Sequence, residues 1–292
     1  RIVALTGDLA PATESDLFRD AFPDRFFTAG IAEANMIGVA AGMARCGDIP
    51  FVHSFSVFLT RRAFDQVAMQ VAYPSLNVKL VGFLPGLTTL LGVSHQAIDD
   101  LTLMRVLPNM TVIEPAGASQ TAAVVRAAAK INGPVYLRLH KAREPITNTA
   151  VEKNLEVGKG QLLRDGDDAV IFACGYMVAE ALLAAETLYL SGINVTVANM
   201  HTIKPFDSEF VLKQSIRTGV VLSAENHSVI GGLGSAVAEV LAERPAGVDI
   251  EFKRIGISDT FAEGGTTAYL FDKYGLSARH IVAAVHDLLE RR

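Results

Sequence analysis

Short apolar runs alternate with longer helix-like stretches along the whole chain, and this alternation restricts the fold more than any other feature of the sequence. The short runs are rich in Ile, Val and Phe and are bounded by Gly, Pro or Asn, which is typical of strands buried on both faces of a parallel sheet. In the first half we predict strands at 2–5, 25–28, 50–53, 78–83, 110–114 and 134–139, and helices at 32–45, 63–71, 97–107 and 119–130. This order predicts a βαβα domain.

The alternation fades between residues 143 and 160, where we predict an interdomain linker, and then it resumes. Strands are predicted at 169–174, 194–198, 220–224 and 251–255, and helices at 178–190, 235–242 and 278–289. The 292 residues suffice for two domains, each with its own core. The sequence therefore predicts an α/β protein with two doubly wound domains.

The composition argues against several partners. The 26 Lys and Arg residues face 31 Asp and Glu residues, which gives a net charge of −5, and there is no basic block to bind nucleic acid. The longest apolar stretch, 169–179, is too short to span a membrane. Cys46 and Cys174 have no Cys or His neighbour at metal-ligand spacing, so we expect no disulfide and no metal held by this chain. Without a signal-peptide pattern, the expected location is the cytoplasm.

Glu33 is the one acid in the small and apolar helix start 30–42, and two interpretations of it are open. A carboxylate in a first helical turn is stabilised by the helix dipole and by unpaired backbone N–H groups, which is a structural role. Alternatively, a carboxyl group withdrawn from water among apolar side chains can share a proton with a nitrogen base.

Phe55 and Phe58 follow a predicted strand and precede Arg61 and Arg62. Aromatic residues three apart usually pack in a core. However, open α/β sheets bind ligands just beyond the carboxyl ends of their strands, so stacking of a planar heterocycle is the alternative.

His95 follows Ser94, which we predict to be the N-cap of a helix, and a lone His in this position is more often structural than catalytic. Two other motifs imitate phosphate or metal sites. The glycines of Gly231-Gly-Leu-Gly fit no phosphate-loop spacing and are predicted to allow close packing. The acids of Gly166-Asp-Asp precede a strand, where they cannot meet a diphosphate bound at its carboxyl end.

Five motifs together resemble the transketolase family, specifically the C-terminal subunit of split transketolases, and the resemblance covers essentially the whole chain. They are Pro23-Asp-Arg-Phe-Phe-Thr-Ala-Gly-Ile-Ala-Glu with its continuation to residue 44, Arg62-Ala-Phe-Asp-Gln, Leu107-Pro-Asn-Met-Thr-Val, Ile203-Lys-Pro-Phe-Asp and Glu225-Asn-His-Ser-Val-Ile-Gly-Gly-Leu-Gly-Ser-Ala.

The resemblance implies a pyrimidine-binding domain at 1–145, a linker at 146–156 and a transketolase C-terminal domain at 157–292. The family's diphosphate-binding domain, whose Gly-Asp-Gly…Asn motif holds Mg²⁺ and the diphosphate of thiamine diphosphate, has no counterpart in this sequence. A separate N-terminal subunit is therefore implied, in an α₂β₂ assembly with self-association of this subunit, and the chain alone is expected to be inactive.

The resemblance also assigns roles to residues. Glu33 matches the catalytic Glu that hydrogen-bonds N1′ of the thiamine aminopyrimidine, which promotes loss of the thiazolium C2 proton and attack of the C2 carbanion on a ketose carbonyl. Phe55 and Phe58 match the aromatic wall for the pyrimidine ring. Asp8 matches an acid near the cofactor and the subunit contact, and His95 matches a catalytic, substrate-facing histidine.

The substrate side departs from the family pattern. Lys141 stands where an Arg usually binds the substrate phosphate, which keeps the charge but loses the bidentate geometry. Phe83 replaces a substrate-contacting His, Leu90 and Leu91 replace Glu-Asp, and Ala12 replaces a phosphate-contacting Ser. A substrate hydroxyl or phosphate left without partners here would lose about 1–3 kcal/mol per contact. The donor is therefore expected to be a less polar, unphosphorylated or otherwise specialised ketose.

The leading hypothesis is a thiamine-diphosphate-dependent transferase subunit that moves a two-carbon ketol unit. Two alternatives within the enzyme class act on 2-oxo acids and release CO₂: a deoxyxylulose-phosphate-synthase-like enzyme and the β-subunit of a 2-oxoacid dehydrogenase. A further alternative, which is not an enzyme, is a catalytically degenerate regulatory subunit. The altered pocket supports this alternative, and the retained Glu33, Phe55, Phe58 and His95 argue against it.

Overall fold

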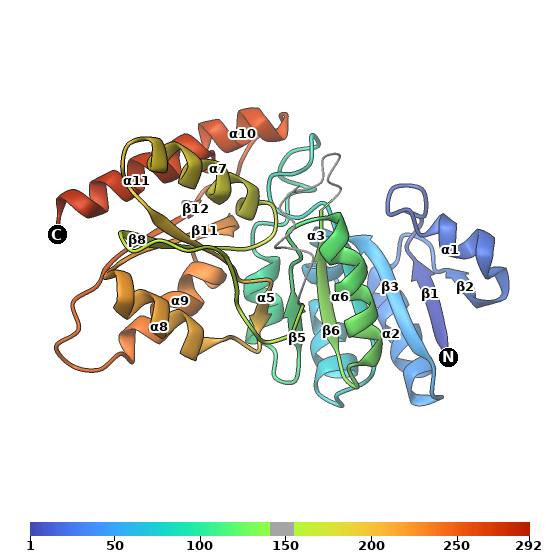
Figure 1. Cartoon of the computed structure of the whole chain (residues 1–292). Helices are drawn as coiled ribbons and strands as arrows, with labels where there is room; N and C mark the ends of the chain where they lie inside the picture. The colour runs from blue at the N-terminus through green and yellow to red at the C-terminus, as the bar shows by residue number, and fades with distance from the viewer. Residues whose placement is uncertain (141–154) are drawn as a thin grey trace.

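The computed structural model describes residues 1–140 and 155–292, which form two α/β halves, each built around one sheet (Figure 1). The first half of the chain contains the strands β1 (Ile2–Thr6), β2 (Phe26–Thr28), β3 (Ile49–Phe55), β4 (Lys79–Phe83), β5 (Thr111–Ile113) and β6 (Val135–Leu139). Its helices are α1 (Asp16–Ala21), the 3₁₀ turn η1 (Pro23–Arg25), α2 (Glu33–Arg45), α3 (Ser56–Thr60), α4 (Phe64–Gln66), the π-helix η2 (Val67–Ala72), α5 (Asp100–Val106) and α6 (Ala118–Lys130).

The second half of the chain contains the strands β7 (Gln161–Arg164), β8 (Ala169–Ala173), β9 (Val195–Asn199), β10 (Thr202–Lys204), β11 (Val220–Ser228) and β12 (Glu251–Ile257). Its helices are α7 (Met177–Leu190), α8 (Ser208–Thr218), α9 (Leu233–Ala242), α10 (Thr267–Lys273) and α11 (Ala278–Glu290). The caps of α8 are encoded locally: the Asp207 side chain accepts from Phe210 N–H at 3.2 Å, and Gly219 ends the helix with a φ of 66°.

The first sheet has the order β10-β5-β6-β4-β3-β1-β2, so it includes β10 from the second half of the chain, and every pair except β10 with β5 is parallel. Residues of α2, η2 and α5 pack on one face of this sheet and residues of α6 pack on the other. Both faces are therefore covered, and this explains why β6 is buried at all five positions.

The second sheet has the order β12-β11-β8-β9-β7, with only β7 antiparallel to its neighbour. Helices α7 and α11 lie above it in Figure 1 and α8 and α9 lie below it. These two faces belong to different cores. The α7 and α11 face forms its own cluster, whereas apolar residues of α8 and α9 join the cluster under α2 and α5 of the first half.

The predicted fold class is confirmed, and the predicted strands overlap observed ones throughout the described residues. Two local predictions are wrong. Ser94 caps no helix, because α5 begins at Asp100 with Asp99 as its N-cap, and His95 lies in a turn. The second half of the predicted helix 63–71 is a π-helix. Most of the predicted linker, 146–154, lies outside the described residues.

Candidate active site

The candidate site lies at the carboxyl edge of the first sheet. Strands β4, β3 and β1 are neighbours and parallel, so the segments that follow them meet at the same edge. Phe55 ends β3, Phe83 ends β4, and Asp8 follows β1. Helix α2 begins at Glu33 next to this edge, because an added Cβ on Gly7 would lie 3.6 Å from Glu33 Oε1.

Glu33 is a buried carboxylate with two side-chain donors. Its side chain is 2% exposed. Ser54 Oγ donates to Oε1 at 3.2 Å, and Arg62 Nη1 donates to Oε2 at 3.2 Å. Glu33 is therefore buried, but its surroundings are not apolar alone, because a hydroxyl and a guanidinium contact its two carboxylate oxygens. The Arg62 side chain is itself 47% exposed, so Glu33 is linked to solvent through its partner.

Phe55, Phe58 and His95 form an aromatic cluster beside Glu33. The ring centroids of Phe55 and Phe58 are 5.8 Å apart, and the His95 ring meets both edge-on at 6.0 Å and 5.2 Å. The Arg62 guanidinium lies 4.1 Å from the centroid of Phe58, which is a cation–π distance. Arg62 thus connects the carboxylate to the aromatic rings.

Phe83 packs on the same cluster from the end of β4. Its ring centroid lies 6.3 Å from that of His53, whose Nδ1 is 3.4 Å from the carbonyl oxygen of Leu5. Burial lowers the pKa of His53 to about 4, which outweighs the backbone hydrogen bonds that act to raise it. At neutral pH this wall of the site is therefore uncharged.

The other predicted residues are less closely grouped. Asp8 is exposed and has a φ of 92°, a strained conformation for a residue other than Gly that often occurs near functional sites. Leu90 and Leu91 are exposed on the loop that carries His95. Ala12 packs against the aromatic cluster. Lys141 lies outside the described residues.

Arg62 and Ser54 belong to the candidate site, but no role was predicted for them from the sequence. The available signal for Arg62 was its position four residues after Phe58, a spacing that brings a cation over an aromatic ring when the segment turns helically. The available signal for Ser54 was its position at the carboxyl end of a parallel strand, where open α/β sheets bind ligands.

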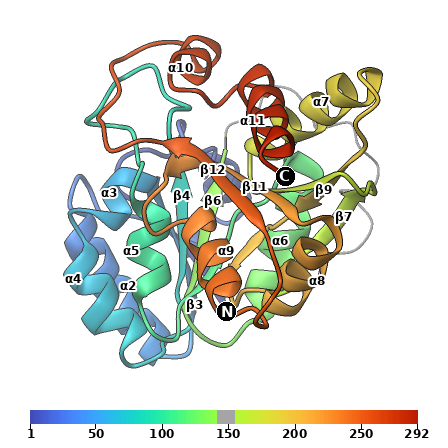
Figure 2. The same cartoon turned by 90° about the vertical axis from the view of Figure 1, so that its left-hand side faces the viewer.

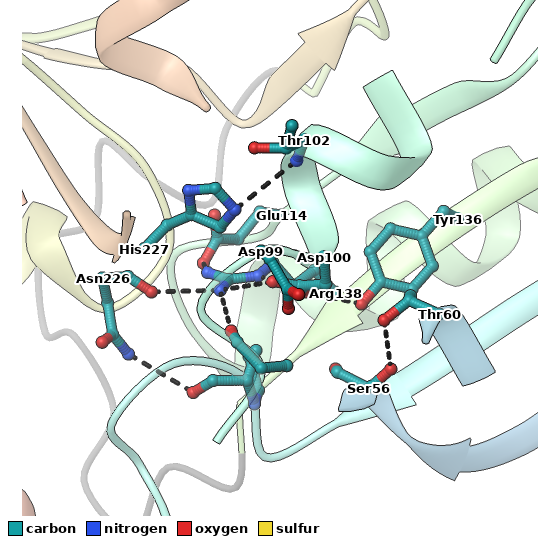
Figure 3. A network of polar contacts seen from close by, with 12 residues as sticks. Ser56, Thr60, Asp99, Asp100, Thr102, Glu114, Tyr136, Arg138, Asn226 and His227 are labelled. Atoms are coloured by element: carbon teal, nitrogen blue, oxygen red, sulfur yellow. Dashed lines mark hydrogen bonds and ion pairs between the residues drawn. The ribbon is translucent and has the colours of Figure 1, made fainter. Parts of the chain in front are cut away.

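A buried ionic network centred on Arg138 of β6 reaches both halves of the chain (Figure 3). Arg138 donates to both carboxylate oxygens of Asp100, at 2.8 and 3.0 Å, and to Glu114 at 2.6 Å. Tyr136 donates to Asp100 at 2.6 Å. Burial acts to raise the pKa of Glu114, but Arg138 and His140 outweigh it and hold this pKa at about 2.

The two motifs that imitate phosphate or metal sites make contacts within the chain, and the close packing predicted for the Gly231 motif is observed. At the Gly231 motif, the backbone N–H groups of Leu233 and Gly234 at the start of α9 donate to the buried Glu225 carboxylate, both at 2.8 Å. An added Cβ on Gly232 would lie 2.0 Å from this carboxylate. At the Gly166 motif, Asp167 pairs with Arg217 at 3.4 Å.

Within residues 1–140 and 155–292, no group of three or more His, Cys, Asp or Glu side chains is placed to hold a metal ion. None of the helices in these ranges combines the length and apolarity that a membrane span requires.

Comparison with known proteins gives two family matches. The transketolase pyrimidine-binding domain matches residues 1–145, and the transketolase C-terminal domain matches residues 158–281. The 6-deoxy-6-sulfo-D-fructose transketolase subunit SqwH of Clostridium sp. (strain MSTE9) is 49% identical, over 100% of this chain and 90% of that protein. A 1-deoxy-D-xylulose-5-phosphate synthase of Syntrophotalea carbinolica is 36% identical over 99% of this chain, which spans 45% of the synthase.

One solved structure, described as a split gene transketolase in an inactive β4 tetramer, superposes with a TM-score of 0.90. It is 48% identical, and the match covers 99% of this chain and 92% of that one.

Proposed function

Because the chain belongs to the transketolase family, we propose that it is the C-terminal subunit of a split transketolase, which moves a two-carbon ketol unit from a ketose donor to an aldehyde acceptor. The observation that carries this proposal is the buried Glu33 carboxylate beside the Phe55, Phe58 and His95 rings.

The residues present fit the pyrimidine half of thiamine diphosphate. A planar ring needs an aromatic wall, which Phe55 and Phe58 can provide, and its nitrogen needs a carboxyl partner, which Glu33 can provide. Gly7 leaves room beside Glu33, because a Cβ there would lie 3.3 Å from the carbonyl oxygen of Gly30. The bound cofactor would supply the carbon nucleophile that accepts the ketol unit.

This chain's own residues then orient the reactants and handle protons. Glu33 holds the proton shared with the ring nitrogen, and Ser54 and Arg62 fix the orientation of its carboxyl group. His95 is half-buried against the aromatic cluster, and its ring could hydrogen-bond the oxygens of a donor.

A separate N-terminal subunit is proposed to hold the diphosphate and Mg²⁺, because this chain matches 90% of the relative named as a transketolase subunit and 92% of the split-gene neighbour. In this chain Gly166-Asp-Asp imitates the metal-diphosphate motif, but Asp167 pairs with Arg217 at the entry to β8. The 48% identical neighbour is described as an inactive β4 tetramer, which supports self-association of this subunit type. We therefore propose an α₂β₂ assembly in the cytoplasm, in which the isolated chain is inactive.

The donor is proposed to be a ketose that ends in a group other than phosphate. Phe83 and Leu91 offer no hydrogen-bonding group to a sugar, and the 49% identical relative is named for a sulfonated ketose. A sulfonate is a tetrahedral oxyanion like phosphate but carries a single negative charge, so it requires less cationic contact.

The test is reconstitution with the N-terminal subunit. The pair should transfer the ketol unit in the presence of thiamine diphosphate and Mg²⁺, with 6-deoxy-6-sulfofructose preferred to xylulose 5-phosphate. Glu33→Gln should lower turnover at least ~100-fold with a nearly unchanged melting temperature, because an amide has nearly the shape of a carboxyl group but cannot share a proton with the ring nitrogen in the same way. Glu180→Gln, at a carboxylate that accepts from Ala278 N–H in the second half, is the matched control. Normal exchange of the thiazolium C2 proton in the Glu33 variant would contradict the assignment.

A 2-oxo-acid donor is the second candidate, supported by the 36% identical synthase and by Leu91 in place of an acid. Release of CO₂ from pyruvate by the reconstituted pair would favour it. An assembly that binds the cofactor but turns over neither donor class would favour a regulatory subunit.

A further inference from the structure

The segment 84–98, here called the His95 loop, connects β4 with α5 and carries His95. Its two ends are paired with each other, because Pro85 and Ala97 form an isolated parallel bridge and Gly86 N–H donates to the Ala97 carbonyl at 2.8 Å. Between these ends, Leu90, Leu91 and Val93 are exposed. The position of His95 therefore depends on what holds the ends.

Asn226, on β11 of the second half, bonds the first end with its side chain. This residue is 1% exposed. Its Oδ1 accepts from Leu87 N–H at 2.9 Å, and its Nδ2 donates to the Pro85 carbonyl at 3.4 Å. One amide thus satisfies a donor and an acceptor of the loop backbone, which is the pairing that an Asn side chain can make and an aliphatic one cannot.

Asn226 reaches the second end of the loop through Arg138 (Figure 3). Arg138 Nη2 donates to the backbone carbonyl of Asn226 at 3.0 Å and to the backbone carbonyl of Ala97 at 3.2 Å. Since Arg138 is fully buried and fixed by Asp100, this bridge is rigid. Both ends of the loop are therefore attached to Asn226.

The loop backbone is shaped to this contact. Gly86 has a φ of 59°, and a Cβ added to it would lie 2.3 Å from both the carbonyl oxygen and Oδ1 of Asn226. Leu84, just before it, also has a positive φ of 53°. A non-Gly residue holds such a conformation only where surrounding contacts enforce it.

The same half of the chain also supports the far side of the loop. Gln96 Nε2 donates to the Glu263 carbonyl at 3.0 Å, and Ser228 N–H donates to the Ile98 carbonyl at 2.8 Å. A Cβ on Gly264 would lie 2.8 Å from the Leu90 carbonyl oxygen. Figure 2 shows this neighbourhood, with the loop before α10 beside the loop before α5.

We propose that Asn226 is a positioning residue for donor recognition: the second half of the chain, through this side chain, sets the His95 loop in the conformation that binds the ketose donor. The proposal rests on the proposed function. It gives the second domain a role in the reaction although none of its residues belongs to the Glu33 site.

The test compares Asn226→Ala with Asn226→Asp in the reconstituted enzyme. Asn226→Ala should raise KM for the donor at least ~5-fold, while C2-proton exchange of the cofactor changes less than ~2-fold, because Glu33 is not touched. Asn226→Asp keeps an acceptor for Leu87 N–H, so its KM for the donor should lie between that of Asn226→Ala and that of wild type. If Asn226→Ala does not fold, Asn226→Ser, which is too short to reach Leu87, replaces it.

Asn199→Ala is the matched control, because Asn199 is also buried and also bonds the first half, at Gln120, but contacts no residue of the His95 loop. It should leave the donor KM unchanged. An equal rise of KM in the Asn199 and Asn226 variants would overturn the proposal, as would an unchanged KM in Asn226→Ala.

Hydrogen–deuterium exchange of the isolated full chain gives a readout that needs no activity. The Leu87 amide should exchange at least ~10-fold faster in Asn226→Ala than in wild type, and equal protection would overturn the proposal. If the wild-type pair shows neither ketol transfer nor C2-proton exchange, the proposed function fails, whereas the exchange experiment still reports on the loop.

Discussion

Three buried glutamates illustrate, at the scale of single residues, how a carboxylate is accommodated away from water. Glu114 pairs with Arg138 and contacts His140. Glu225 accepts from two N–H groups of α9, and burial raises its pKa despite these bonds. Glu33 differs because its cationic partner, Arg62, is half-exposed. The buried Glu33 carboxylate is thus connected to solvent through Arg62, and a ligand can approach it from that side. Among these three, Glu33 is the one suited to a ligand.

Acid sensitivity is expected at His201, which is 1% exposed. Burial lowers the pKa of His201 from 6.5 to about 4. The unfolded chain therefore binds a proton at a higher pH than the folded chain, so this contribution to stability is complete above the ordinary pKa and is lost as the pH falls towards 4.

At about pH 5 the loss should be on the order of 2 kcal/mol. Urea unfolding of wild type and His201→Gln, each near neutral pH and near pH 5, measures it: the variant should lose about 2 kcal/mol less stability on acidification. An equal loss in both proteins would contradict the prediction.

At the scale of elements, helix α9 shows why a glycine-rich strand-to-helix turn need not bind phosphate. Gly232 and Gly234 leave space for the side chains of β11, and the Glu225 carboxylate occupies the N-terminal position that an anion would take. The helix is therefore capped from within the chain.

Glu225→Ala should destabilise the protein by about 2–5 kcal/mol, because it leaves two buried N–H groups without an acceptor. Glu225→Gln keeps an acceptor oxygen and should cost less. Glu239→Ala, on the exposed side of the same helix, should cost under about 1 kcal/mol. Denaturant unfolding of the three variants checks this order, and a Glu225→Ala cost no larger than that of Glu239→Ala would disprove it.

At the scale of the whole molecule, the two halves share structure. Strand β10, from the second half, pairs with β5 and completes the first sheet. Apolar residues of α8 and α9 join the core under α2 and α5, and the Arg138 network bonds Asn226. The halves are therefore expected to unfold together.

Calorimetry of the isolated chain should show one transition, and Arg138→Ala should move that transition as a whole to lower temperature. The variant leaves the buried Asp100 and Glu114 carboxylates without their cation, which costs about 3–5 kcal/mol. Arg291→Ala, at a surface ion pair with Asp287, is the control and should have little effect. Two separate transitions would show that the shared core does not couple the halves.

The sequence by itself determined the fold class and pointed to several residues of the candidate site. Strands buried on both faces must be apolar along their length, so most of the strands could be found from runs of Ile, Val and Phe. Three residues of the site, Phe55, Phe58 and Glu33, lie next to strand ends or a helix start, where short motifs are informative. Helix α8 was missed although Asp207 and Gly219 marked its two ends.

Only the tertiary structure decided which distant groups meet. Strand β10 has three residues, too few to show a period, and its partner β5 lies in the other half. The bond from Asn226 to Leu87 spans 139 residues. Local periodicity reports whether a residue faces a core or solvent, but it does not specify the side chain that will satisfy a particular buried N–H group. That choice depends on how two sheets pack, and it fixes the position of His95.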